Sequence, residues 1–186
     1  MEKKTTNEAL AESFKKLVLT QPIEKITIKE ITDNAGVIRP TFYNHFQDKY
    51  ELLEWIIREE LIEPIIPLVN GGFIKESLTL IFTNVENEKE FYMHAARLEG
   101  QNSFASIVQK LIEERLKEYI ISKCGEDGHF RKWMTPDMLA EYYARSIRFI
   151  TVKWILTDMI IPPSELAALC ETVFESNLDE IIGQMK

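Results

Sequence analysis

Residues 27–46 constrain the fold more than any other part of this chain, because they carry the signals for two short helices joined by a tight turn. Thr27 and Glu30 have the spacing of a capping box, which predicts that a first helix begins there. Gly36 can take the positive φ that ends this helix, and Pro40 suits the first turn of the next one. These signals predict a helix-turn-helix whose second helix spans residues 39–46.

The second of these helices has one apolar side and one polar side. Phe42 and Phe46 are four residues apart, so they share a face that we expect to be buried. Polar and aromatic side chains on the other side of a rigidly held helix are what reading base edges in DNA requires. The alternative is an ordinary three-helix packing unit with an aromatic core. It does not account for the outward positions of Arg39, Thr41 and Tyr43.

This stretch resembles the N-terminal DNA-binding domain of the TetR family of transcriptional regulators. The residues that carry the resemblance are Ala35-Gly36-Val37, Arg39-Pro40-Thr41-Phe42-Tyr43, His45-Phe46, Lys49 and Leu52. One position departs from the family pattern, because Ile38 stands where the family usually has Ser, Asn or Thr. That residue normally caps the recognition helix and often contacts a phosphate. The resemblance implies that the helix beginning near Arg39 enters the major groove.

The resemblance and the chemistry of the side chains together predict the DNA contacts. Arg39 can pair with guanine and Asn44 with adenine, while the carbon atoms of Pro40 or Thr41 can meet a thymine methyl group. Phosphate contacts are expected from Tyr43, His45 and Lys49, the last of which lies at the start of the following helix. For His45, the alternative is a role in helix packing. Thr27 is expected to contact the DNA backbone on the other flank. The expected DNA-binding residues are Thr27, Arg39, Pro40, Thr41, Tyr43, Asn44, His45 and Lys49.

Helical periodicity runs through nearly the whole chain, and we find no alternating pattern long enough to predict a strand. The sequence therefore predicts an all-α fold with a three-helix DNA-binding domain, residues 1–50, and a six-helix domain, residues 51–186. The TetR resemblance implies that the second domain binds a ligand and dimerises. Asp48 and Glu51 form another capping pattern, which predicts a helix that runs to Pro64, and prolines and glycines in residues 64–72 predict a break after it. The expected helices after this break span residues 73–84, 88–99, 103–124, 135–159 and 163–183.

Charge is distributed unevenly along the chain, whose net charge is −8. Residues 1–50 contain eight Lys and Arg against seven Asp and Glu, and the remainder contains fourteen against twenty-three. This balance argues against a protein that coats nucleic acid by bulk attraction. A nearly neutral N-terminal part fits a sequence reader that places a few phosphate contacts locally.

A single short helix reads too few base pairs for useful specificity, so we expect a homodimer on a palindromic DNA operator. The last two expected helices carry apolar residues at helical spacing, and two copies of them would form a four-helix bundle. The alternative is that these residues form an ordinary monomer core. The expected interface residues are Tyr143, Ile147, Trp154, Leu166, Cys170, Val173 and Phe174.

The C-terminal part more loosely resembles regulators of dihydroxyacetone kinase, mainly in residues 97–104 and 153–159. This resemblance fixes neither the sign of regulation nor the ligand. We expect a repressor that a small-molecule effector releases from DNA. Aromatic and polar residues on the central helices are candidates for the effector pocket, although such a stripe is more often plain core. The candidates are Phe91, Tyr92, His94, Phe104, Trp133, Tyr142 and Phe149.

Other classes of function are poorly supported by the sequence. There is no Gly-x-Ser-x-Gly, no phosphate-binding glycine loop and no His-Glu-x-x-His, and the histidines and cysteines are too dispersed to predict a zinc site. We therefore expect no enzyme, no metal and no cofactor. The absence of a signal peptide or a long apolar run, with two unpaired cysteines, predicts a cytoplasmic protein without a membrane span. The alternative function is a helical co-regulator that works through a partner protein, with weak or no DNA binding.

Overall fold

The computed structural model describes residues 5–124 and 135–175, and every regular element within these ranges is helical. The all-α fold is thus confirmed. The elements in chain order are α1 (Thr6–Val18), η1 (Ile23–Lys25), α2 (Ile28–Ala35), α3 (Arg39–Tyr43), α4 (Lys49–Ile57), η2 (Arg58–Ile62), η3 (Glu63–Ile65), α5 (Ile66–Asn70), α6 (Ile74–Asn87), α7 (Lys89–Ala95), α8 (Phe104–Cys124), α9 (Pro136–Leu156) and α10 (Pro163–Glu175).

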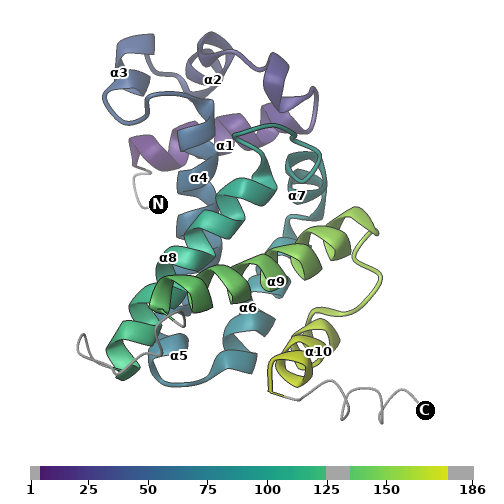
Figure 1. Ribbon diagram of the computed structural model, residues 1–186. Helices are drawn as coiled ribbons and strands as arrows, with labels where there is room; N and C mark the ends of the chain where they lie inside the picture. Colours follow the sequence, from purple (N-terminus) through teal and green to yellow (C-terminus); the bar gives the residue numbers. More distant parts are fainter. Residues whose placement is uncertain (1–4, 125–134, 176–186) are drawn as a thin grey trace.

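The first three α-helices lie together at one end of the molecule, and α4 leads away from them (Figure 1). Helix α1 begins at a capping box between Thr5 and Glu8, which satisfies backbone N–H groups that the first turn leaves free. Its inner face buries Phe14, and the hydroxyl of Ser13 donates a 2.7 Å hydrogen bond to the carbonyl of Ile31. This buried bond fixes α1 against α2.

The region between α4 and α6 differs from the prediction. We expected one helix up to Pro64 and then a break, but α4 gives way to the π-helical turn η2, and α5 lies within the expected break. The three-plus-six division is therefore not reproduced in the described residues. The reason is that Pro64 and Pro67 each stand in the first turn of a short helix, where a missing N–H group costs nothing. These prolines begin helices rather than interrupt them.

The remaining helices pack in pairs. Helix α8 lies along α9, and α10 packs against α6 (Figure 1). One continuous apolar core runs from Leu10 in α1 to Cys170 in α10 and includes the buried face of α4. The core therefore does not divide at residue 50. The last expected helix was to reach residue 183, and its final part lies outside the described residues.

A polar cluster joins α1 to the segments that follow α4. The ammonium of Lys15 forms an ion pair with Glu60, in η2, and a second one, at 2.7 Å, with Glu88. The hydroxyl of the buried Tyr92 donates to Glu60 Oε2 at 3.2 Å. The side-chain amide of Asn84 donates to the carbonyl oxygen of Glu60 at 2.9 Å. Glu60 is thus the residue at which α1, α6 and α7 are tied to the π-helical turn.

The stability of the chain is expected to carry a pH-dependent contribution from Glu60. Burial raises the pKa of the Glu60 carboxyl above its ordinary value of 4.5, an effect that Lys15 partly offsets. The folded chain then holds this proton more tightly than the unfolded chain, so the free energy of unfolding falls as the pH rises from 4.5 through the raised pKa. Urea titrations at several pH values should show this slope in the wild type and not in Glu60→Gln. Glu59→Gln, at the adjacent exposed position, is the control and should keep the slope. If the free energy of unfolding depends on pH in the same way in wild type and Glu60→Gln, the slope does not come from Glu60.

Candidate nucleic-acid interface

The turn between α2 and α3 is built by two local features. Thr27 caps α2, since its hydroxyl oxygen accepts from the backbone N–H of Glu30 at 3.2 Å while the Glu30 carboxylate accepts from the backbone N–H of Thr27 at 2.8 Å. Gly36 ends the helix in the left-handed conformation, with φ 71° and ψ 28°. A side chain at this φ would be strained, which explains the glycine. Both features agree with the sequence prediction.

Three aromatic rings hold α3 in place from behind. Phe42 is fully buried, and its ring centre lies 5.8 Å from that of Phe46, which in turn lies 6.0 Å from that of Trp55 in α4. The helix ends at Tyr43, three residues earlier than predicted. Phe46 nevertheless stays buried, because its backbone N–H still donates to the carbonyl of Phe42 at 2.9 Å. The aromatic row gives α3 a fixed orientation on α4.

The outward side of α3 carries most of the predicted DNA-binding side chains. Arg39, Pro40, Tyr43, Asn44 and His45 are exposed, and Thr41 is half-buried. A guanidinium nitrogen of Arg39 donates to the hydroxyl oxygen of Tyr43 at 3.0 Å, and the guanidinium carbon lies 5.5 Å from the centre of the Tyr43 ring. Arg39 thus lies back along the helix over Tyr43, whose hydroxyl hydrogen remains available for a phosphate oxygen.

Two further predicted contact residues have partners within the chain. The hydroxyl of Thr27 donates to Glu30 Oε2 at 2.7 Å as part of the cap. The ammonium of Lys49 donates to the carbonyls of Glu24 and Ile26 at 2.7 and 2.8 Å, and burial lowers the pKa of Lys49. These carbonyl contacts join residues more than twenty positions apart, so no local pattern in the sequence announces them.

The start of α4 is also occupied by the chain itself. The carboxylate of Asp48 accepts hydrogen bonds from the backbone N–H groups of Tyr50 and Glu51, at 2.8 and 2.9 Å. These amides lie at the helix start where we expected Lys49 to contact a phosphate. A negatively charged cap removes that opportunity, because it takes up the donors and repels an anion. This leaves α3 and the turn that precedes it as the candidate reading surface.

Comparison with known proteins matches both halves of the chain to regulators. Residues 15–56 match the family described as "Bacterial regulatory proteins, tetR family", and residues 74–176 match "Transcriptional regulator C-terminal region". The chain belongs to the TetR family of transcriptional regulators. The expectation that the protein is not an enzyme is confirmed, since the matched families and relatives are regulators.

Among curated proteins, this TetR-family chain is similar to the HTH-type dhaKLM operon transcriptional activator DhaS of Lactococcus lactis subsp. lactis (strain IL1403). The two are 30% identical over 151 residues, which are 81% of this chain and 80% of the relative. This match confirms the resemblance to dihydroxyacetone kinase regulators.

Solved structures share the fold. A dihydroxyacetone kinase operon activator DhaS has a TM-score of 0.63 at 22% identity, over 90% of this chain and 93% of that one. The fatty acid degradation regulator FadR from Bacillus halodurans has a TM-score of 0.62 at 14% identity, over 96% and 98%. NalD, the secondary repressor of the MexAB-OprM multidrug efflux pump in Pseudomonas aeruginosa, has 0.53 at 16% identity, over 89% and 92%.

The residues predicted to form an effector pocket come together only in part in this TetR-family fold. Phe91, Tyr92 and Phe104 are buried, and the ring of Tyr92 meets those of Phe91 and Phe104 edge to face, with ring centres 5.0 and 6.0 Å apart. His94 is exposed, and Tyr142 and Phe149 are each 61% exposed on α9. Periodicity identified these two as apolar-face residues but could not tell an inner face from an outer one. Trp133 lies outside the described residues.

A small apolar cavity lies in the interior of the C-terminal part. Its volume is about 20 Å³, and its walls come from α4, η2, α6, α8 and α9. This is the space of a single water molecule, far below the 300–1,000 Å³ of an ordinary ligand pocket. The lining residues are Ile57, Leu61, Ile62, Leu78, Ile81, Phe82, Phe104, Val108, Ile112, Ile147 and Thr151.

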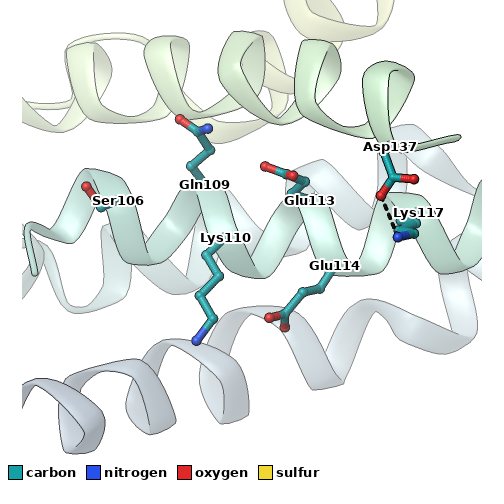
Figure 2. Close-up of a pocket in the computed structure, with 7 residues that line it drawn as sticks. All are labelled: Ser106, Gln109, Lys110, Glu113, Glu114, Lys117 and Asp137. Carbon is teal, nitrogen blue, oxygen red and sulfur yellow. Dashed lines mark ion pairs between the residues drawn. The ribbon is translucent and has the colours of Figure 1, made fainter. Parts of the chain in front are cut away.

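A larger hollow of about 420 Å³ lies on the surface of α8. Figure 2 shows Gln109 and Glu113 turned toward one neighbouring helix, Lys110 and Glu114 turned toward the other, and Lys117 paired with Asp137. Lys110 pairs with Glu54 at 2.8 Å, and Glu114 pairs with Arg58 at 3.2 Å. Because these charges are already paired and open to water, the hollow is a solvated groove rather than an effector pocket.

The predicted interface residues divide between the inside and the outside of the chain. Trp154, Leu166 and Cys170 are buried in the chain's own core, and burial raises the pKa of the Cys170 thiol to about 11. Tyr143, Ile147 and Phe174 are half-buried, and Val173 is 39% exposed. The exposed large apolar side chains of α9 and α10 form what we call the outer stripe: Tyr142, Phe149, Leu156, Leu169 and Val173.

Within the described ranges no helix is both long and apolar enough to cross a bilayer.

Proposed function

We propose that this regulator binds a palindromic operator as a homodimer, with α3 of each copy in the major groove. The observation that carries the proposal is the geometry of α3. Its back is fixed by the buried Phe42 and Phe46, while Arg39, Tyr43 and, directly after the helix, Asn44 are exposed. Arg39 would exchange its hydrogen bond to Tyr43 for a base contact. A rigid helix that presents bidentate donors is suited to direct readout of base edges. The chain would act in the cytoplasm, where bacterial operators lie.

Dimerisation through α9 and α10 is supported by the outer stripe. On α9, Tyr142, Phe149 and Leu156 recur every seven residues, so they lie along one side of the helix, and they are 50–61% exposed. Leu169 and Val173, four residues apart on α10, are 47% and 39% exposed. Exposed apolar rows of this kind mark interaction surfaces in soluble proteins. A second copy that covers the stripe would complete a four-helix bundle.

The sign of regulation and the signal form the less constrained part of the proposal. The sequence led us to expect a repressor, whereas the Lactococcus lactis relative is named an activator, which favours activation for this chain as well. The 20 Å³ apolar cavity that Phe104 helps to line would have to be enlarged before it could hold a small-molecule effector. The small volume of this cavity favours a second candidate function, in which the regulator receives its signal by binding a partner protein.

Selection of bound genomic fragments tests the proposed function. The purified chain should enrich fragments that share a palindrome, and its affinity for that palindrome should fall steeply as salt rises, because phosphate contacts release counterions. A reporter gene placed behind the palindrome then gives the sign of regulation. Absence of any enriched palindrome would contradict operator binding and favour the partner-protein function.

Arg39 and Tyr43 are expected to contribute to DNA binding in different ways. Arg39→Ala should lose discrimination at one or two base pairs, on the order of 1–3 kcal/mol, because a base contact is removed. Tyr43→Phe should weaken binding to all sequences by a similar factor, because a phosphate contact carries no sequence information. Binding to a panel of operator variants measures both effects, with the exposed Arg97→Ala as control. An unchanged base preference in Arg39→Ala would rule out direct readout by this residue.

A further inference from the structure

Ile38 is the residue at which this chain departs from the pattern of its family, and the structure places it at the edge of the reading surface. It directly precedes α3 with an extended backbone, φ −86° and ψ 151°, and its side chain makes no capping hydrogen bond. The side chain is 70% exposed, and among the described large apolar residues only Ile160 is more exposed. The preceding residue, Val37, packs partly against the core, so Ile38 points away from it.

Isoleucine at this position does little for the folding of the free chain. A polar residue here could cap α3, and burial of the side chain would gain hydrophobic free energy, but Ile38 provides neither effect. It also has no hydrogen-bond donor for a phosphate oxygen. If α3 enters the major groove, the side chain gains hydrophobic free energy where an apolar group of a base covers it.

The side chains around Ile38 make the leading edge of α3 apolar. Arg39 lies back over Tyr43, held by their 3.0 Å hydrogen bond. Besides Arg39, the exposed residues at the start of the helix are Ile38 and Pro40. The major-groove edges of DNA offer one apolar group, the 5-methyl of thymine. We infer that Ile38 reads a thymine methyl group in each half-site of the operator.

This inference rests on the proposed operator binding and adds a base to what is read. Its test replaces each thymine of the selected palindrome by deoxyuridine, symmetrically in both half-sites, which removes only the methyl group. At one position the substitution should weaken wild-type binding about four-fold per half-site, or about fifteen-fold in the dimer, as expected for one buried methyl-sized group. The Ile38→Ser variant should bind the two duplexes equally well.

Two further variants separate the contact from indirect effects. Ile38→Val keeps branched methyl groups and should retain most of the sensitivity to deoxyuridine, whereas Leu19→Ser removes an exposed apolar residue outside α3 and should retain all of it. Ile38→Ser is expected to fold, because serine is a favourable cap for α3. If deoxyuridine weakens wild-type binding at no thymine, or weakens binding of Ile38→Ser as much as that of the wild type, the inference about Ile38 is overturned while operator binding stands. A selection that enriches no palindrome would overturn operator binding and the inference with it.

Discussion

Replacing Phe149 by aspartate is expected to leave the chain folded but monomeric, and to weaken its affinity for the operator by roughly 10²–10⁴-fold. Phe149 is 61% exposed and lies seven residues from both Tyr142 and Leu156, at the middle of the α9 part of the outer stripe. In a dimer the new carboxylate would lose its hydration without a partner. In the monomer it would stay in water close to Lys153, whose ammonium lies 5.7 Å from the centre of the Phe149 ring.

The loss of affinity follows from linkage of the two half-sites. A dimer binds its second half-site as an intramolecular event, and a monomer does not. Sedimentation equilibrium measures the association, and fluorescence anisotropy with a labelled duplex measures the affinity. Phe73→Asp is a matched control, because Phe73 is 54% exposed and lies at the start of α6, outside the outer stripe. A Phe149→Asp protein that remains dimeric would contradict the interface.

Replacing Phe42 by alanine is expected to lower the free energy of unfolding by about 3–5 kcal/mol. Phe42 is fully buried and begins the aromatic row that continues through Phe46 to Trp55. The cavity left behind would border the recognition helix, so operator binding should be lost even at temperatures where most of the chain is still folded. A typical domain is stable by 5–15 kcal/mol, so this single change removes a large part of the total.

Urea denaturation at one fixed protein concentration is the appropriate measurement, because the stability of a dimer depends on concentration. Phe73→Ala removes the same side chain from an exposed position and should change the free energy of unfolding by no more than about 0.5 kcal/mol. A loss below about 1 kcal/mol in Phe42→Ala would mean that α3 is held by something other than the aromatic row.

The local parts of the reading surface were predictable from sequence because their signals are local. The capping box of Thr27, the left-handed Gly36 and the pairing of Phe42 with Phe46 each depend on residues no more than four positions apart. The engagement of Lys49 with the carbonyls of Glu24 and Ile26 was not predictable in this way. A basic residue at a helix start fits a phosphate contact and a backbone contact equally well.

The C-terminal part was less predictable for a different physical reason. Helical periodicity tells which residues share a face, but not whether that face meets the same chain or a second copy. Trp154 was therefore expected at an interface although it is 3% exposed, and its indole N–H donates to the carbonyl of Ile161 at 2.7 Å. Phe149 was expected inside although it is mostly exposed. The short helix α5 was missed because proline was taken as a break rather than as a first-turn residue.

The Lys15–Glu60 ion pair sets a rule for building chimeric regulators from this chain. A graft of a foreign N-terminal segment that ends at residue 50 would bring a new residue opposite Glu60, whose side chain is two-thirds removed from solvent at 34% exposure. Without a cation there, the carboxylate would keep its desolvation but lose its compensation. The graft would also separate Phe46 from Trp55. Crossovers placed after η2 keep both of these contacts within one parent, whereas the bonds of Glu60 with Asn84 and Tyr92 still cross the junction.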